Sequence, residues 1–157
     1  MAYRHYAPTY GALSGEGARM QGGRWNLPGS FAVIYAAPDL ETVDAEFDRA
    51  VRRARLSREQ LRPRQLATLR LDLRNVLDLR DEAVLQILGV AREELVQDDV
   101  TLPQLLGDVA HDVGYEAVLA PSAASSGDVI AIFPDNRSPE SSLEVVGVRA
   151  YPGRTKD

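Results

Sequence analysis

Three residue types that can do chemistry stand close together in the first third of this sequence. Arg24 lies in a glycine-rich segment, Tyr35 falls at the end of the apolar run that follows, and Glu46 falls on the next predicted helix. A guanidinium binds oxyanions through forked hydrogen bonds, and a carboxylate stabilises a developing positive charge. The three side chains reach one site only if a loop, a strand and a helix converge there.

The segment around Arg24 has the composition of a constrained loop. Residues 22–29 read Gly-Gly-Arg-Trp-Asn-Leu-Pro-Gly. Glycine permits a positive φ and proline holds φ at about −65°, so both residue types fix the backbone. Trp25 is expected to anchor the loop in the core rather than to stack on a base, and Asn26 to cap the turn.

Hydrophobic spacing predicts the elements that position these residues. Strands are predicted at residues 3–7, 31–36, 66–73, 115–120, 129–133 and 143–151, and a long ordered loop at residues 8–29. Helices are predicted at residues 38–54, 81–88, 91–96 and 101–113. Because strands and helices do not alternate regularly, the predicted class is α+β, with mixed, mostly antiparallel sheets and flanking helices.

The predicted helix that carries Glu46 is amphipathic. Its apolar positions recur at 3.6-residue spacing and are expected to face the core: Val43, Phe47, Ala50, Val51 and Ala54. Glu46 borders this face. The basic positions Arg49, Arg52 and Arg53 are expected to lie largely outside it.

The composition limits the classes of protein to which this sequence can belong. With 157 residues, 45% of them hydrophobic and 26% charged, the sequence fits a single domain over residues 1–157. No apolar run approaches the roughly 20 residues of a membrane-spanning helix, and the N-terminus lacks the apolar stretch of a signal peptide, so we expect a cytoplasmic protein with no membrane partner. The absence of cysteine excludes disulfides and thiolate chemistry, and two histidines argue against a metal site.

The distribution of charge along the sequence indicates which kinds of binding partner to expect. A formal net charge of −5 disfavours a general nucleic-acid binder, because phosphate neutralisation rewards a basic surface. Arginines nevertheless gather in the basic segment 49–64. This segment leaves open a second class of function, a non-catalytic module that binds an acidic partner or nucleic acid. Charge runs are usually solvated faces, and no aromatic residue interleaves with these arginines as single-strand binding favours.

The order and spacing of several motifs resemble the RES domain family over nearly the whole chain. The resemblance rests on Tyr3-Arg4, on residues 22–29, on Tyr35 with Glu46 eleven residues later, and on Gly114-Tyr115 leading into Ala120-Pro121-Ser122-Ala123. It implies a fold similar to that of ADP-ribosyltransferases. It also implies the toxin of a toxin–antitoxin pair, with an activity that consumes NAD+.

The implied reaction is cleavage of the nicotinamide–ribose bond of NAD+ by phosphorolysis or hydrolysis. NAD+ is then the substrate, no separate cofactor is expected, and the acceptor is inorganic phosphate or water. Transfer to a protein side chain, which is ADP-ribosylation, is the neighbouring alternative. The resemblance also implies a cognate protein antitoxin, and it leaves open a homo-oligomer or a hetero-oligomer with that antitoxin.

The chemistry of this bond gives the candidate residues roles. Its cleavage passes through an oxocarbenium-like state, so Glu46 is the candidate stabiliser beside the anomeric carbon, with a solvated helix carboxylate as the alternative. Arg24 suits a pyrophosphate oxygen, with a surface ion pair as the alternative. Tyr35 is the candidate for positioning the nicotinamide ribose, and an ordinary strand tyrosine is an equal alternative. These three residues form the expected catalytic set.

The expected substrate-binding set is Arg4, Ser122 and Asp128. Arg4 would hold a phosphate, unless it merely faces water at a strand edge. Ser122 lies on a Pro-Ser-Ala turn, where its hydroxyl would bond a substrate amide or phosphate; a turn or helix-capping serine is the alternative. Asp128 stands where the family typically shows Asn. An aspartate donates no amide proton and its charge opposes a nearby phosphate, which bears on the acceptor.

Overall fold

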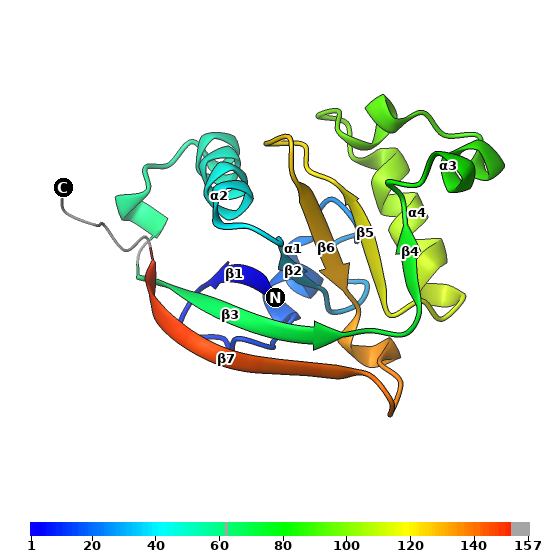
Figure 1. The fold of residues 1–157 in the computed structure, drawn as a ribbon. Coiled ribbons are helices and arrows are strands. Elements are labelled where there is room, and N and C mark those ends of the chain that lie inside the picture. The colour runs from blue at the N-terminus through cyan, green and yellow to red at the C-terminus, as the bar shows by residue number, and fades with distance from the viewer. Residues whose placement is uncertain (62, 152–157) are drawn as a thin grey trace.

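Two β-sheets frame the computed structural model, which describes residues 1–61 and 63–151 (Figure 1). The three-stranded sheet is antiparallel, with the order β1 (Ala2–Tyr6), β3 (Arg64–Asp72), β7 (Ser142–Tyr151). The four-stranded sheet has the order β2 (Ile34–Ala36), β6 (Asp128–Ile132), β5 (Ala117–Pro121), β4 (Val76–Asp78), and only β4 and β5 run parallel. Arg62 of the basic segment and residues 152–157 of the expected domain lie outside the described residues.

Four α-helices and three 3₁₀ turns accompany the sheets in the described residues. They are α1 (Glu16–Gln21), α2 (Leu40–Ala54), η1 (Glu59–Leu61), α3 (Glu82–Leu88), η2 (Arg92–Leu95), α4 (Thr101–Asp112) and η3 (Pro134–Asn136). Asp39 caps α2 by accepting a hydrogen bond from the backbone N–H of Thr42 at 2.7 Å. In Figure 1, α2 lies near one end of the three-stranded sheet, and α3 and α4 flank the four-stranded sheet. The predicted α+β class is confirmed.

The helix α1 and the strand β4 depart from the sequence prediction. The segment 8–29 was expected to be a loop throughout, yet it contains α1, which has no side-chain N-cap and buries no residue. A helix without a cap or an apolar face leaves no pattern to detect. The strand β4 was not predicted, because it has three residues and is held by parallel pairing to the distant β5.

Among residues 1–61 and 63–151, no helix combines the length and the apolar character that crossing a bilayer requires.

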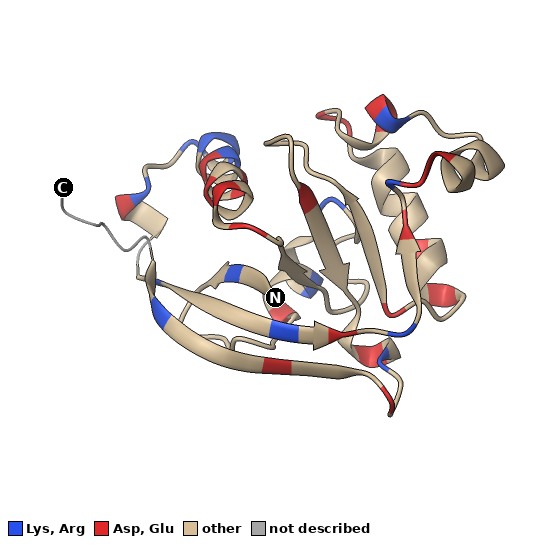
Figure 2. Ribbon diagram, in the orientation of Figure 1, with Lys and Arg blue, Asp and Glu red and all other residues tan. Residues whose placement is uncertain are grey.

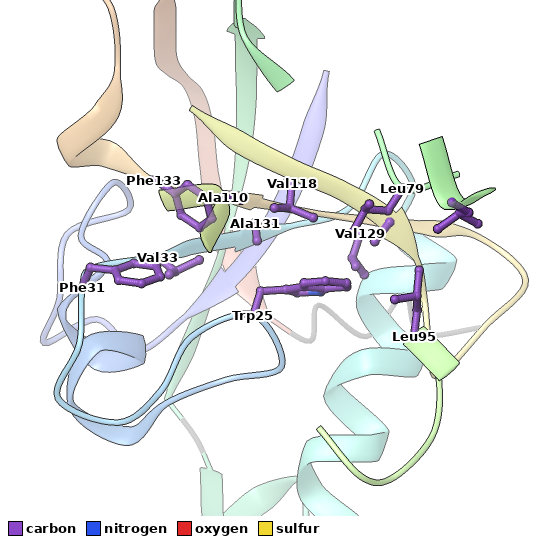
Figure 3. Packing of buried hydrophobic residues seen from close by; sticks show 12 residues of the cluster. Trp25, Phe31, Val33, Leu79, Leu95, Ala110, Val118, Val129, Ala131 and Phe133 are labelled. Atoms are coloured by element: carbon purple, nitrogen blue, oxygen red, sulfur yellow. The ribbon is translucent and has the colours of Figure 1, made fainter. Parts of the chain in front are cut away.

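The four-stranded sheet is buried on both faces. Successive side chains of a strand point to opposite sides, so β6 gives Val129 and Ala131 to one core cluster and Ile130 and Ile132 to another. The first cluster packs around Trp25 and Phe133 (Figure 3), and the second fills the space between the two sheets. Burial on both faces explains why the central strands read as continuous apolar runs.

A third cluster fixes α2 on the three-stranded sheet. Val43, Phe47 and Val51 of the helix pack against Leu66 of β3 and Tyr151 of β7. The hydroxyl of Tyr151 also donates a hydrogen bond to the carboxylate of Asp44. This packing sets the direction in which the remaining face of α2 points.

Glu116 is a buried carboxylate that anchors two loops. Only 1% of its surface is exposed, and its oxygens accept hydrogen bonds from the backbone N–H groups of Arg74, Asn75 and Ser138 at 2.7, 2.8 and 2.7 Å. The hydroxyl of Ser141 donates a fourth hydrogen bond. Burial alone would raise the pKa of Glu116, but these donors lower it to about 2.

We expect Glu116→Gln to lower the free energy of unfolding at pH 7 by about 2–3 kcal/mol, because an amide cannot satisfy converging donors. The folded-state pKa lies below the usual value of 4.5, so the stabilisation is present above about pH 4.5 and is lost as the pH falls toward 2. Urea unfolding across this range should show the difference between wild type and variant shrinking with acid. Glu140→Gln, at an exposed position, is the control; an equal effect of both changes would contradict the anchoring role.

Candidate active site

A cleft of about 590 Å³ lies between β1, β2, α2 and the loop before β2. Most of its lining comes from residues 3–5, 22–25 and 35–37 and from one face of α2. Its volume suits a small-molecule ligand. The charged lining consists of one carboxylate and four guanidinium groups: Glu46, Arg4, Arg24, Arg49 and Arg53. A chain of net charge −5 therefore presents a basic cleft suited to an anionic ligand.

The hydroxyl of Tyr35 ties β2 to the loop 22–29. It accepts a hydrogen bond from the backbone N–H of Trp25 at 2.9 Å and donates one to Oδ1 of Asn26 at 2.7 Å. The amide of Asn26 in turn donates to the carbonyl oxygen of Ala18 at 2.8 Å. Burial raises the pKa of Tyr35, so the hydroxyl stays protonated. The ring of Tyr35 lines the cleft while its hydroxyl belongs to the loop.

Close packing against α4 and Tyr35 fixes the same loop. A Cβ on Gly107 of α4 would lie 1.9 Å from the carbonyl oxygen of Trp25, and one on Gly23 would lie 2.5 Å from the hydroxyl of Tyr35. Gln104, also on α4, donates to the carbonyl oxygen of Gly23 at 3.0 Å. Trp25 is 1% exposed, which confirms its predicted place in the core.

Arg24 joins this loop to the end of η2 and the chain that follows it. Its Nη1 donates to the carbonyl oxygens of Gln97 at 2.7 Å and Leu95 at 3.3 Å. Its Nη2 is buried and has no hydrogen-bond partner among the described residues. Burial, followed by the nearby charge of Arg49, lowers the pKa of Arg24. The guanidinium thus has an unused donor and a destabilised charge, both of which an oxyanion would satisfy.

Glu46 and Ser122 meet at the cleft, although 76 positions separate them in sequence. The hydroxyl of Ser122 donates to Oε1 of Glu46 at 2.6 Å, and it accepts the backbone N–H groups of Ala124 and Ser125 at 3.0 and 3.2 Å. These two donors orient the hydroxyl proton toward the carboxylate. Among the described residues, no hydrogen bond reaches Oε2 of Glu46, so this oxygen can face a ligand.

The face of α2 beside Glu46 corrects the predicted orientation of the helix. Ala50 and Ala54 are exposed and line the cleft instead of packing in the core, and Arg49 and Arg53 line it with them. The reason is that Phe47 and Val51 already bury the opposite flank of the helix against β3 and β7. Residues spaced by three or four positions lie on the same face of a helix. These four residues therefore share the face of α2 that carries Glu46, and this face lines the cleft.

Arg49 lines the cleft and links α2 to two other segments of the chain. Its Nη1 donates to the carbonyl oxygen of Ala123 at 2.7 Å, and its Nη2 pairs with Asp98 at 2.8 Å. Sequence reasoning assigned Arg49 to a solvated basic face. The signal that could have found it is its spacing of one helical turn from Glu46.

Arg4 lines the cleft but is largely committed to the backbone. Its Nη1 and Nη2 donate to the carbonyl oxygens of Ala12 and Ser14 at 3.1 and 2.8 Å. Burial and the nearby charge of Arg64 lower its pKa to about 10, so it stays charged at neutral pH. These contacts hold the loop after β1 against that strand.

His5 lies beside Arg4 in the lining and was not a sequence candidate. Burial, followed by the charge of Arg64, lowers its pKa to about 3. Its Nδ1 accepts a hydrogen bond from Nε of Arg64 at 2.8 Å. The imidazole is therefore neutral near pH 7, and its proton resides on Nε2.

Ser122 reaches the cleft only through its hydrogen bond to Glu46, and Asp128 is separated from the cleft altogether. Asp128 pairs with Nη1 of Arg80 at 3.0 Å, and Arg80 also pairs with Asp78 at 2.9 Å. Val129 lines the cleft, and the preceding residue of the strand points to the opposite side. The carboxylate of Asp128 thus meets a guanidinium outside the lining, where its charge is neutralised.

Within the described ranges, no group of three or more His, Asp and Glu side chains is placed to hold a metal ion.

Tyr35→Phe should lower the free energy of unfolding by about 1–3 kcal/mol, because it leaves the N–H of Trp25 and the Oδ1 of Asn26 unpaired. Tyr3→Phe is the matched control: Tyr3 also lines the cleft, but within residues 1–61 and 63–151 its hydroxyl makes no hydrogen bond, so a change below about 0.5 kcal/mol is expected. Urea unfolding measures both. Equal losses in the two variants would contradict the role given to the Tyr35 hydroxyl.

Comparison with known proteins places this geometry in a family. The NAD(+) phosphorylase MbcT of Mycobacterium tuberculosis is 31% identical over 139 residues, which cover 87% of this chain and 75% of that protein. The probable NAD(+) phosphorylase Rv3189 of the same organism is 32% identical over 133 residues, covering 83% of this chain and 63% of its own length.

A solved structure has the same fold. The crystal structure of the M. tuberculosis MbcT–MbcA toxin–antitoxin complex matches with a TM-score of 0.81 and 29% identity, over 95% of this chain and 82% of that chain. The sequence model of the RES domain family matches residues 1–152 of this chain. The resemblance inferred from the sequence motifs is therefore confirmed, and this chain belongs to the RES domain family.

Proposed function

We propose that this protein is the toxin of a toxin–antitoxin pair and that it cleaves the nicotinamide–ribose bond of NAD+, with inorganic phosphate as the acceptor. The observation that carries the proposal is the carboxylate of Glu46, held by Ser122 in a cleft whose other charged lining groups are guanidiniums. Such a cleft offers an anion site for a dinucleotide's phosphates and one negative group for a cation.

Glu46 stabilises the sugar as the bond breaks. The electron pair of the C–N bond leaves with the nicotinamide, which becomes neutral, and positive charge develops on the ribose. Oε1 of Glu46 is engaged by Ser122, so the negative charge on Oε2 faces the developing cation. An oxygen of phosphate then forms the new bond to the anomeric carbon. Ser122 acts as a positioning residue that fixes the carboxylate's orientation.

The arginines of the cleft have different roles in binding the substrate. Arg24 offers its unpaired Nη2, and Arg49 offers a guanidinium whose present partner, Asp98, has a side chain 99% exposed. The side chain of Arg49 is 15% exposed and keeps an anionic partner when a phosphate replaces Asp98, which returns to water. Arg4, which is bonded to two carbonyl oxygens, mainly orders the loop beneath the cleft. The ring of Tyr35 forms part of the cleft wall.

The acceptor and the partner follow from the basic lining and the relatives. The relatives bear the name NAD(+) phosphorylase, and phosphate is an anion that the guanidinium groups attract more strongly than water. MbcT occurs in a complex with its antitoxin MbcA, which supports a cognate protein antitoxin for this chain as well. NAD+ is a cytoplasmic metabolite, so the toxin acts in the cytoplasm.

Incubation of the purified chain with NAD+, with and without inorganic phosphate, tests the proposal, with products identified by mass. We expect ADP-ribose 1″-phosphate to form only when phosphate is present. Glu46→Gln should lower kcat at least about 100-fold, because the amide carries no charge to stabilise the cation. Glu41→Gln, an exposed change on the same helix, is the control and should retain wild-type rates.

Other products would identify other functions. ADP-ribose formed at the same rate without phosphate would indicate hydrolysis. Labelling of a protein would indicate ADP-ribosylation. No turnover by the folded, antitoxin-free chain under any condition would contradict the proposal and favour a binding module that uses the basic segment 49–64.

A further inference from the structure

The outer edge of β7 is long and carries exposed valines. β7 pairs with β3 on one side, and among the described residues no strand pairs with its other side (Figure 1). Val145, Val146 and Val148 are 38%, 40% and 49% exposed along it. An edge of this kind presents unpaired backbone N–H and C=O groups that template the addition of another strand.

A β-bulge in β7 determines which of its side chains lie on the same face of the sheet. The register shifts between Thr68, which pairs with Gly147, and Leu69, which pairs with Val145, so Val146 is the extra residue. Val145 and Val148 therefore lie opposite Leu69 and Ala67, two positions apart on β3, and share one face.

The charged residues of β7 share the other face. Glu144 and Arg149 lie opposite Arg70 and Leu66, which are four positions apart on β3. Glu144 already contacts Arg70, with 3.6 Å between the carboxylate and the guanidinium. Figure 2 shows acidic and basic positions set apart along β7. A strand without the bulge would place Glu144 and Arg149 on opposite faces.

We propose that a second copy of this chain pairs antiparallel with this edge, about a two-fold axis between Val146 and Gly147. In that register Glu144 lies opposite the second copy's Arg149, and Val145 lies opposite its Val148. Both pairs occur twice by symmetry, as an isologous interface requires. The two three-stranded sheets join into one continuous sheet.

The chemistry of the edge favours a second copy over other occupants. Each opposite-charge pair directly across a sheet is favourable, and the two-fold axis places Glu144 of each copy opposite Arg149 of the other. Gly147 at the axis has no side chain, so the two backbones can approach closely; a Cβ there would meet only Thr68, at 4.0 Å. No residue of β7 is among the residues that line the cleft, so the pairing leaves the candidate active site open.

Light scattering on the purified chain over a concentration series tests the interface. Every sample carries Glu46→Gln, so that cells tolerate production of the chain. We expect a dimer, and we expect Arg149→Glu to raise its Kd about tenfold, since the introduced carboxylate faces Glu144 of the other copy on both sides of the axis. Arg137→Glu, an exposed change outside β7, should leave Kd unchanged. Equal thermal unfolding of both variants shows that they are folded.

Oxidative crosslinking tests the register. The sequence contains no cysteine, so only introduced thiols react. Val145→Cys with Val148→Cys should give a covalent dimer, while the two positions within one strand are about 10 Å apart and cannot join. Glu144→Cys with Val148→Cys places the thiols on opposite faces and should not crosslink. A monomer at all concentrations, a dimer indifferent to Arg149→Glu, or equal crosslinking of both cysteine pairs would overturn the proposal.

Discussion

The hydrogen bond between Ser122 and Glu46 is the contact on which the cleft depends. It joins α2 to the turn between β5 and β6, two parts of the chain that meet only through tertiary packing. The backbone N–H groups of Ala124 and Ser125 hold the serine oxygen, so the hydroxyl has one direction left for its proton. The carboxylate is thereby oriented before any ligand arrives. Such preorganisation is what lets a single charge stabilise a short-lived cation, because no reorganisation is needed during the reaction.

The loop 22–29 builds another side of the cleft and is held by contacts from β2 and α4. The hydroxyl of Tyr35 forms hydrogen bonds with the backbone N–H of Trp25 and the side chain of Asn26 in this loop. The side chain of Gln104 donates a hydrogen bond to a carbonyl group of the loop, and Gly107 lets α4 approach the backbone of Trp25. These supports carry Arg24 into a place where part of its guanidinium has no partner among the described residues. The structure thus keeps a buried cationic donor opposite an oriented carboxylate. A basic cleft with one negative group matches a ligand that is anionic overall and becomes cationic at one carbon.

The sequence predicted the α+β class, the main strands and the helix that carries Glu46, because these elements have clear periodicity and end signals. It also grouped residues from distant segments, since the motif order of the RES domain supplied what periodicity could not. It missed Arg49, because an amphipathic pattern does not distinguish solvent from the wall of a cleft. It did not separate Asp128 from the cleft, because Arg80 approaches it only through the pairing of β4, β5 and β6. Glu116 was missed for the same reason, as its donors come from two loops that are distant in sequence.

The most direct test of the central claim is a crystal structure of the Glu46→Gln variant with NAD+ bound. The account predicts the dinucleotide in the cleft, with its phosphates against Arg24 and Arg49, Asp98 released from Arg49, and the anomeric carbon of the nicotinamide ribose beside the side chain of residue 46. NAD+ bound elsewhere, or bound with its phosphates at Glu46 and its nicotinamide against the arginines, would contradict the assignment of roles on which the mechanism rests.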